Sequence, residues 1–372
     1  MRVVIDCFKQ VKGAGKSIGI YNVALSLTQN LVEEQRRTVN ETIRQAEIIV
    51  LGNAYNRDDF AIDGVQFFEV DTYDPLNKAH CVLWELFGVA KVCKKLKADR
   101  ILYPRGYCAL THPVKDIVLI HDLIPFYYDE HFPGVFGRAE NAYIMNRLKA
   151  SARSAAQIIT ISEASKKDII KYCGVKEEKI SVIHNACNAI AFDEEKEPQS
   201  EPYICAITSG LPHKNAKGIL ESYRKYCEIS NDPLNLVMIG IADTSMCQLP
   251  EEVKAKVTCY KFIKNNDDMY RIINNSGVFM FLSLVEGFGL PPIEAMQLKV
   301  PVVCSKLSSL PEVVGDAAVL VDPTSAEDVA VNLKKLIADE AMRSVLVSKG
   351  TENVKRFSWE TRANLYWKEL LR

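Results

Sequence analysis

The chain has 372 residues, of which 48% are hydrophobic and 25% are charged. This composition is ordinary for a globular protein and excludes a disordered or fibrous one. The formal net charge is −1, which excludes a nucleic-acid binder with an overall basic surface. The length is about two to three times that of a typical domain and predicts two domains.

Short apolar, β-branched runs alternate with segments of helical spacing. The helix expected at 18–34 places Ile20, Leu27 and Leu31 on one face, with Ser17 as its N-cap. Near-continuous apolar strands indicate burial on both faces, as in a parallel sheet covered by helices, so we expect an α/β, doubly wound fold. The expected strands are 2–8, 46–51, 99–103, 116–120, 157–161, 179–183, 203–208, 234–240, 277–282, 300–304 and 317–321.

The alternation breaks once, at 187–202, where the chain is acidic, carries two prolines and loses its periodicity. The final segment has helical spacing again, and its two tryptophans favour docking of that helix over fraying. The predicted boundaries are a first domain at 1–190, a linker at 191–202, a second domain at 203–356 and a terminal helix at 357–372.

The sequence shows no signal for export or for membrane insertion. The start, "MRVVIDCF", has no apolar stretch or cleavage site typical of a signal peptide, and no apolar run of about 18 residues occurs. The 11 cysteines are scattered, without a C-x-x-C pair or a histidine at metal spacing. They predict reduced thiols in a cytoplasm rather than a disulfide framework or a zinc site.

The first half has a small excess of basic residues in helical segments. We interpret them as solvated helix faces or, alternatively, as a contact for an anionic acceptor or a lipid surface at the inner face of a membrane. The residues are Lys91, Lys94, Lys95, Lys97, Arg138, Arg147, Lys149 and Arg153.

The residues that follow the strands carry the functional signals, because ligands of doubly wound sheets bind beyond the carboxyl ends of strands. The first such turn, "KQVKGAGKSIG" at 9–19, resembles part of a P-loop, but Gln10 stands where the Walker pattern has its first glycine. A glycine-rich turn that opens a helix is either an anion site or simply a tight turn.

Two turns in the second half point to a phosphorylated ligand. Lys214 begins a helix whose N-terminus is already partly positive, which favours a bound anion, although a surface lysine is the plain alternative. In "SLVEGFGLPPIEAM", Glu286 and Glu294 flank a second helix N-terminus. An anion site beside acceptors for hydroxyls suits a sugar phosphate, whereas capping is the alternative role for Glu294.

These segments resemble a known family. "EGFGLPPIEAM" is similar to the Glu-x7-Glu signature of retaining glycosyltransferases of family 4, "PHKN" to their lysine-containing phosphate motif and "IHDLIPF" to their His-Asp loop. "SIGIYNVALSL", "AQIITISEASKKDI", "PVVCSKLSSLPEVVGDAAVLVDP" and "FSWE" resemble further family segments, in chain order from about residue 2 to about residue 360.

The resemblance implies a GT-B fold, in which two Rossmann-like domains face a cleft and the terminal helix crosses back to the first domain. It implies transfer of a hexose from a nucleotide diphosphate sugar, bound by the second domain, to an acceptor bound by the first, with retention of configuration. "GFGLPPIEAM" with "HDLIPF" looks most like bacterial mannosyltransferases of surface polysaccharide synthesis, so GDP-mannose and a glycan or lipid-linked acceptor are the expected substrates.

The resemblance also assigns roles to residues. Lys214 would bind the diphosphate, Glu286 would lie near the transferred sugar and His121 by the reacting centre, and Glu294 would bind the ribose. Backbone N–H groups at Phe288, Gly289 and Leu290 would contact phosphate or sugar hydroxyls, and Gly19 would let the first loop approach the phosphates. Ser209 and His213 stand where many members have arginine, and Lys299 replaces a common glycine.

The chemistry needs a counter-charge for the departing diphosphate. The chain has no Asp-x-Asp pair, so we expect no metal and no other cofactor. Lys214 and the loop from Gly287 would instead converge on one diphosphate across a gap between the domains. The alternatives are a sugar-nucleotide epimerase of the same fold, a P-loop NTPase, a non-catalytic sugar-nucleotide binder, and a double displacement with Glu286 as nucleophile.

Overall fold

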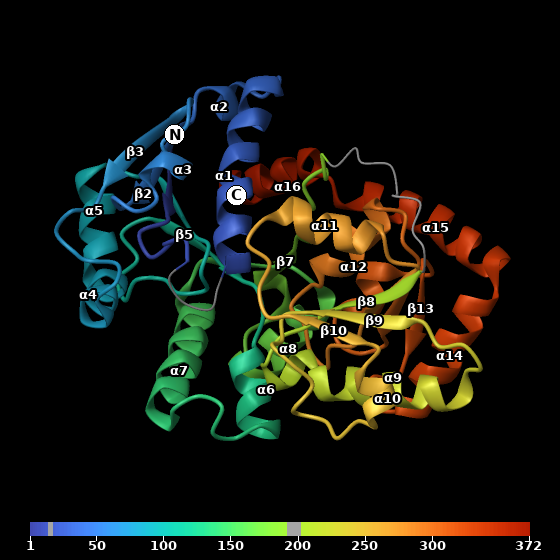
Figure 1. Cartoon of the computed structure of the whole chain (residues 1–372). Coiled ribbons are helices and arrows are strands. Elements are labelled where there is room, and N and C mark those ends of the chain that lie inside the picture. Colours follow the sequence, from blue (N-terminus) through green and yellow to red (C-terminus); the bar gives the residue numbers. More distant parts are fainter. Residues whose placement is uncertain (14–17, 192–201) are drawn as a thin grey trace. The chain divides into compact units, whose positions relative to one another are not determined.

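The computed structural model describes residues 1–13, 18–191 and 202–372 (Figure 1). These residues form two compact units, one of Met1–Ala186 with Ser358–Arg372 and one of Cys187–Phe357. The second unit therefore begins inside the stretch where the sequence loses its periodicity. Residues 192–201 of the expected linker, and the expected N-cap Ser17, lie outside the described residues.

The first unit is built on a sheet with the order β3-β2-β1-β4-β5-β6-β7. Every strand pair that its described residues form is parallel, and the register sets Val4 against Ile49 and Ile101. The strands are β1 (Arg2–Asp6), β2 (Glu47–Gly52), β3 (Val65–Glu69), β4 (Arg100–Tyr103), β5 (Lys115–Ile120), β6 (Gln157–Thr160) and β7 (Ile180–Val182).

Helices cover this sheet and bury its apolar residues, as the continuous hydrophobic strands require. The helices are α1 (Ile18–Arg37), α2 (Glu41–Arg44), α3 (Arg57–Phe60), α4 (Lys78–Leu83), the π-helix η1 (Trp84–Gly88), α5 (Val89–Lys95), α6 (Ile124–His131), α7 (Arg138–Ser154), α8 (Glu163–Cys173), the 3₁₀ turn η2 (Glu177–Lys179) and α16 (Trp359–Leu371). The core combines Val4, Ile101 and Val118 of the strands with Trp84 and Leu148 of the helices.

The last helix belongs to the first unit, although the whole second unit precedes it in the chain. Figure 1 shows α16 beside α1. Trp367 is fully buried, and its indole Nε1 donates to the Leu31 carbonyl oxygen at 3.0 Å. Asn364 Nδ2 donates to Glu34 Oε1 at 3.0 Å. Burial of the indole with its N–H satisfied is what the tryptophan-rich terminal segment predicts.

The second unit repeats the plan with the sheet order β10-β9-β8-β11-β12-β13, again parallel throughout the described residues. Its strands are β8 (Tyr203–Ile207), β9 (Asn235–Ile239), β10 (Val257–Tyr260), β11 (Val278–Phe281), β12 (Val302–Ser305) and β13 (Ala318–Val321). Its helices are η3 (Pro212–Lys214, 3₁₀), α9 (Ala216–Ile229), α10 (Glu251–Lys254), α11 (Asn266–Asn274), α12 (Leu290–Gln297), α13 (Leu310–Val314), α14 (Ala326–Ala338), α15 (Glu340–Val354) and η4 (Lys355–Phe357, 3₁₀).

The α/β, doubly wound fold class is confirmed, and each predicted strand is present to within one or two residues at its ends. The sequence does not predict β3 and β10. Each lies at one end of its sheet and pairs on one side only. Unlike the opposite end strands β7 and β13, neither has a fully buried residue. They therefore lack the continuous apolar signature of a strand that is buried on both faces.

Candidate active site

The second unit places two loops at the point where its strand order reverses. β8 and β11 are neighbours in the sheet, yet the chain runs outward from them in opposite directions. Ligands of parallel sheets bind beyond the carboxyl ends of strands at such a reversal. The loops that follow these strands, 208–215 and 282–289, contain most of the residues that the sequence predicts for donor binding.

Hydrogen bonds join these two loops. The Leu284 N–H donates to the His213 carbonyl oxygen at 2.8 Å, and Asn215 Nδ2 donates to the Leu282 carbonyl oxygen at 3.0 Å. Thr208 Oγ1 donates to the Lys214 carbonyl oxygen at 2.9 Å. Asn215 holds a left-handed backbone (φ 56°) between the 3₁₀ turn and α9, a conformation that asparagine tolerates better than most residues. The backbone on both sides of Lys214 is therefore fixed.

Lys214 and Glu286 form an ion pair between the two loops. Lys214 Nζ lies 2.6 Å from Glu286 Oε1, with side chains that are 26% and 10% exposed. The ammonium also lies 5.7 Å from the centre of the Phe281 ring. Lys214 and the loop from Gly287 both belong to the second unit, so the prediction that they meet across a gap between domains is wrong. They meet within one domain.

Two serines hold the backbone of Glu286. Ser308 Oγ accepts from the Glu286 N–H at 3.2 Å, and the hydroxyls of Ser308 and Ser309 both donate to the Glu286 carbonyl oxygen, at 2.8 and 3.0 Å. Ser309 Oγ also lies 2.8 Å from the Phe288 carbonyl oxygen. The sequence alone does not assign a role to Ser308 or Ser309. Their only signal is their place in "SKLSSLPEVVG", directly after a buried strand.

The N-terminus of α12 presents its backbone donors beside this loop. The first four N–H groups of a helix have no acceptor within the helix. Here two of these positions are Pro291 and Pro292, which have no N–H. The donors that helix geometry leaves over are therefore those of Gly289 and Leu290, and the positive end of the helix dipole lies with them. The Phe288 N–H, the third donor of the prediction, precedes the helix cap.

Gly289 is required for two reasons. Its φ is 107°, and a Cβ at this position would lie 2.4 Å from Leu310 Cδ2. Phe288, its neighbour, is buried and packs edge-on against Phe357 with ring centres 5.4 Å apart. A fixed aromatic anchor on one side and a glycine on the other set the course of the loop into α12.

His213 does not add a second positive charge beside Lys214. The side chain is buried, and desolvation together with the Lys214 charge lowers its pKa to about 4, against the opposing effect of Glu286. At neutral pH the imidazole is therefore uncharged and does not supply the positive charge of the family's arginine. Ser209 acts within the turn, where its Oγ accepts from the Leu211 N–H at 3.3 Å.

Glu294 lies one turn into α12 and has a different environment from Glu286. Burial raises the pKa of its carboxyl group to about 7. Its electrostatic neighbours are Cys187 and Tyr270, whose own pKa values are raised chiefly by burial and further by the Glu294 charge. The carboxyl group is therefore poised to change its charge near neutral pH.

In the first unit, His121 directly follows β5. It is buried, and its Nε2 lies 2.8 Å from the Pro104 carbonyl oxygen. A carbonyl can only accept, so this nitrogen carries the proton. Burial, with a smaller contribution from the nearby Arg105 charge, lowers the pKa of His121 to about 4, against the opposing effect of its hydrogen bond to Pro104. His121 is therefore a neutral imidazole at neutral pH and has no proton to give as an imidazolium.

Gly19 occupies the first turn of α1 and is exposed. A Cβ there would meet nothing within 4 Å among the residues that the structure describes, so none of these residues demands glycine at this position. The neighbouring residues 14–17 of the P-loop-like turn lie outside the described residues.

A charged network that the sequence analysis missed lies beyond β1 and β4, where the strand order of the first sheet reverses. Lys9 pairs with the buried Glu85, whose Oε2 accepts from the Tyr143 hydroxyl at 3.1 Å. Arg105 Nη1 donates to the Lys9 carbonyl oxygen at 2.7 Å. Burial raises the pKa of Asp6 to about 6, despite the indole N–H that it accepts from Trp84. The signal available in the sequence was Lys9, which lies three residues beyond the end of β1.

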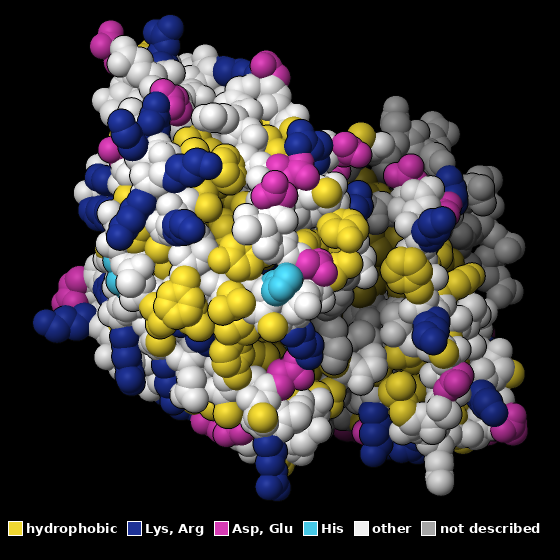
Figure 2. All heavy atoms as spheres, turned by 90° about the vertical axis from the view of Figure 1, so that its left-hand side faces the viewer, with side chains coloured by type: hydrophobic (Ala, Val, Ile, Leu, Met, Phe, Trp, Pro, Cys, Tyr) yellow, Lys and Arg dark blue, Asp and Glu magenta, His cyan; other side chains and the backbone are white. Residues whose placement is uncertain are grey.

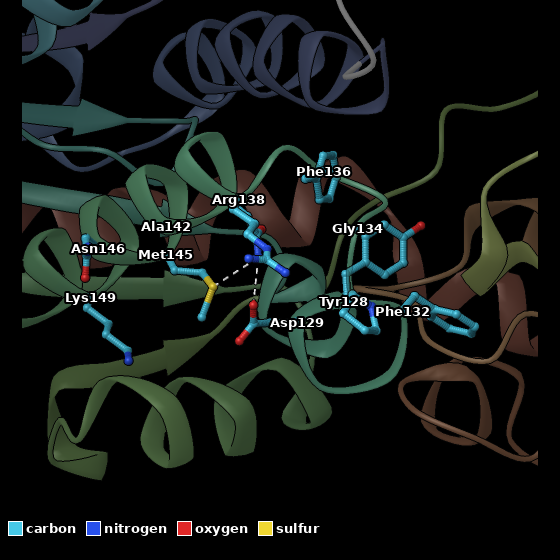
Figure 3. Close-up of a pocket in the computed structure, with 12 residues that line it drawn as sticks. Tyr128, Asp129, Phe132, Gly134, Phe136, Arg138, Ala142, Met145, Asn146 and Lys149 are labelled. Carbon is cyan, nitrogen blue, oxygen red and sulfur yellow. Dashed lines mark hydrogen bonds between the residues drawn. The ribbon is translucent and has the colours of Figure 1, made fainter.

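A pocket of about 410 Å³ lies along α6 and α7 of the first unit (Figure 3). Tyr128 and Phe132 supply aromatic walls, and Arg138 and Lys149 supply cations. Asn141 Nδ2 donates to Asp129 Oδ1 at 3.4 Å and lies 3.3 Å from the Met145 sulfur, along the dashed lines of Figure 3. Arg147, which the sequence predicts on a solvated or lipid-facing helix surface, is instead buried. Its Nη2 donates to the Cys108 carbonyl oxygen at 2.5 Å.

Two parallel, doubly wound sheets, with a lysine–carboxylate pair at a helix N-terminus beyond one of them, define a glycosyltransferase of the GT-B fold. Residues 188–353 match the family model described as glycosyl transferases group 1, and residues 31–189 match the model of glycosyltransferase family 4. The chain belongs to these glycosyltransferases, so the resemblance seen in the sequence is confirmed.

The relatives include bacterial mannosyltransferases. O-antigen chain mannosyltransferase B of Escherichia coli is 26% identical over 71% of this chain and 77% of its own length. O-antigen chain mannosyltransferase RfbU of Salmonella typhimurium is 32% identical over 58% of this chain and 60% of its own length. Among solved structures, the sucrose-phosphate synthase of Thermosynechococcus elongatus matches 100% of this chain and 99% of its own, with a TM-score of 0.71 at 15% identity, which shows the shared fold.

Substitution of Gly289 tests the geometry of this loop. Gly289→Ala forces a side chain into a left-handed backbone and against Leu310, which should destabilise the second unit by about 1–3 kcal/mol. Gly210→Ala is the matched control, because a Cβ there meets nothing within 4 Å and its φ is not positive. Urea unfolding of both variants measures the difference, and equal stabilities would contradict the strained loop.

Proposed function

We propose that the protein is a retaining mannosyltransferase that uses a nucleotide diphosphate sugar, GDP-mannose in the first instance, and needs no metal. The ion pair of Lys214 with Glu286 carries this proposal, because Glu286 belongs to the same loop that leads into the N-terminus of α12 and its backbone donors. The mannosyltransferase relatives support the choice of sugar. The first unit would bind the glycan or lipid-linked acceptor.

In the proposed reaction, the bond between the sugar C1 and the diphosphate oxygen breaks and negative charge grows on the departing phosphate. The Lys214 ammonium and the Gly289 and Leu290 N–H groups would stabilise that charge, which is the work that a metal performs in other transferases. Glu286 aims the ammonium while the site is empty and would turn to the sugar hydroxyls when the diphosphate takes over the ammonium. A same-face attack would then retain the configuration at C1.

A panel of nucleotide sugars, offered with acceptor glycans in chelator-treated buffer, tests the proposal. We expect transfer from one donor, a product with the donor's anomeric configuration by NMR, and protection from thermal unfolding by the matching nucleoside diphosphate. Conversion of the donor without acceptor would instead identify an epimerase. Hydrolysis of ATP with magnesium would identify an NTPase, and protection without turnover would identify a non-catalytic binder.

Lys214→Ala removes the proposed counter-charge. Turnover should fall roughly 100-fold or more, as when one oxyanion donor is removed elsewhere. Lys217→Ala is the matched control, since Lys217 lies on α9 and its side chain is 66% exposed. Steady-state rates measure the effect, with thermal unfolding as a check that both variants fold. A Lys214→Ala rate within a few-fold of wild type would remove this residue from the mechanism.

Glu294 makes donor binding depend on pH. Ribose hydroxyls donate to a carboxylate, whereas the protonated acid, with its pKa near 7, competes as a donor itself. Because the raised pKa keeps the acid form below pH 7, affinity should rise about tenfold from about pH 6 to pH 8. Calorimetric titration measures this rise, which Glu294→Gln should abolish. The same rise in the glutamine variant would assign it to another group.

We further propose that the first unit contacts the anionic inner face of a membrane, with the protein in the cytoplasm. Its exposed apolar side chains include Leu83, Phe87 and Leu110, and the Leu110 N–H donates to the Leu86 carbonyl oxygen, which joins their segments. Figure 2 shows hydrophobic side chains gathered on one face of this unit, with lysines and arginines around them. No helix among the described residues is long and apolar enough to span a bilayer.

The double variant Leu83→Ser with Phe87→Ser tests this contact. Wild-type protein should float with vesicles that contain phosphatidylglycerol and release at high salt, whereas the double variant should lose most of its binding. Val345→Ser, which alters an exposed apolar residue of the second unit, should bind as wild type does. Equal flotation of all three proteins would contradict the contact.

A further inference from the structure

The loop between β4 and β5 and the start of β5 bring together three side chains that the transfer reaction does not use. Cys108, His112 and Asp116 offer ligand atoms that all lie within 4.8 Å of one another. His112 Nδ1 lies 2.6 Å from Asp116 Oδ2. In the part of the chain that the structure describes, this is the one group of three or more His, Cys, Asp or Glu side chains close enough to share a metal ion.

Cys108 and Asp116, the two buried residues of this group, are held in place by hydrogen bonds to α7 and to the backbone just after it. The Cys108 N–H donates to Ser151 Oγ at 3.0 Å, and its Sγ lies 3.5 Å from Ser154 Oγ. Asp116 Oδ1 accepts from the Ala156 N–H at 2.9 Å, which leaves Oδ2 directed at His112. A ligand oxygen oriented by a hydrogen bond to its partner oxygen is a common feature of metal sites.

His112 is the most exposed of the three residues. Its side chain is 29% exposed, whereas that of Asp116 is 3% exposed. Ligand atoms around a tetrahedral zinc ion lie about 3.5 Å apart, given bond lengths of about 2.0–2.3 Å. The three ligand atoms, which lie within 4.8 Å of one another, draw closer together when they bind an ion. The exposure of the imidazole gives the ion a path from solvent.

We propose that Cys108, His112 and Asp116 form a zinc site. A thiolate, an imidazole and a carboxylate are the ligand types that zinc takes together in proteins, whereas calcium and magnesium select oxygen ligands alone. Binding releases the Cys108 thiol proton to solvent and joins the sulfur to the ion. The fourth ligand is water, because His112 leaves that side open.

The position of the site gives it a structural role. Asp116 lies near the start of β5, whereas His121 follows the carboxyl end of the same strand, so the two occupy opposite edges of the sheet. Ligands of such sheets react at the carboxyl edge. Zinc at the other edge ties the 104–114 loop to the start of β5, and it is independent of the metal-free transfer chemistry proposed for the second unit.

The charges around the site are compatible with a bound zinc ion. The Lys179 ammonium lies close enough to Asp116 and Cys108 to interact electrostatically with both. In the metal-free chain it offsets the Asp116 carboxylate, and its Nζ donates to the Arg153 carbonyl oxygen at 2.7 Å. With zinc bound, two anionic ligands neutralise the dication, so the lysine does not prevent binding.

Titration of the whole chain with cobalt(II), a spectroscopic substitute for zinc, tests the proposal. One equivalent should give a thiolate-to-cobalt charge-transfer band and visible absorption of tetrahedral intensity, both removed by one equivalent of zinc. Zinc in about 100-fold excess over its dissociation constant should raise the thermal unfolding midpoint by about 5 °C. His112→Ala and Cys108→Ser should each lose the charge-transfer band.

The controls are Cys81→Ser and His131→Ala, which remove another partly buried thiol and another exposed histidine of the first unit. Both should keep the band and the stabilisation. If Cys108→Ser does not fold, His112→Ala decides, because that side chain is exposed. The absence of a charge-transfer band in wild type, or its persistence in His112→Ala, would overturn the zinc site and leave His112 and Asp116 as a simple ion pair.

Discussion

The ion pair between Lys214 and Glu286 is the interaction on which the candidate site depends. A pair with so little exposure costs desolvation on both sides, and it is retained only where its geometry is fixed. The structure fixes it from both loops: Leu284 bonds to the His213 carbonyl oxygen, and Ser308 holds the backbone of Glu286. The carboxylate keeps the ammonium aimed while the site is empty. A diphosphate, with more negative charge and more acceptor oxygens, can take its place.

The sheets explain why this pair lies where it does. In each unit the order of parallel strands reverses between two neighbours, and the loops beyond those strands collect the polar groups. In the second unit these groups are the lysine, the glutamate and the N-terminus of α12. In the first unit they are Lys9, Glu85 and Arg105. The opposite edge of the first sheet carries the Cys108 cluster, where a metal would support the fold rather than the reaction.

The sequence predicts the buried strands, which share one repeated pattern, and the polar residues in the loops that follow them. Buried parallel strands have a continuous apolar signature, so nearly all of them could be predicted, whereas the edge strands β3 and β10 could not. Lys214 and Glu286 could be found because each lies in the loop that follows a predicted strand. That they pair within one domain depends on tertiary contacts, and so do the neutral state of His213 and the clamp of Ser308. No local sequence pattern indicates the ion pair, the neutral imidazole or the serine contact.

The central claim is that Lys214 binds the outer phosphate of the donor. Calorimetric titration of a nucleoside diphosphate and the matching monophosphate into wild type and Lys214→Ala tests it most directly, because the four affinities isolate the coupling between one side chain and one phosphate. Wild type should prefer the diphosphate strongly, and the variant should bind the two ligands almost equally. A variant that keeps the wild-type preference would contradict the account.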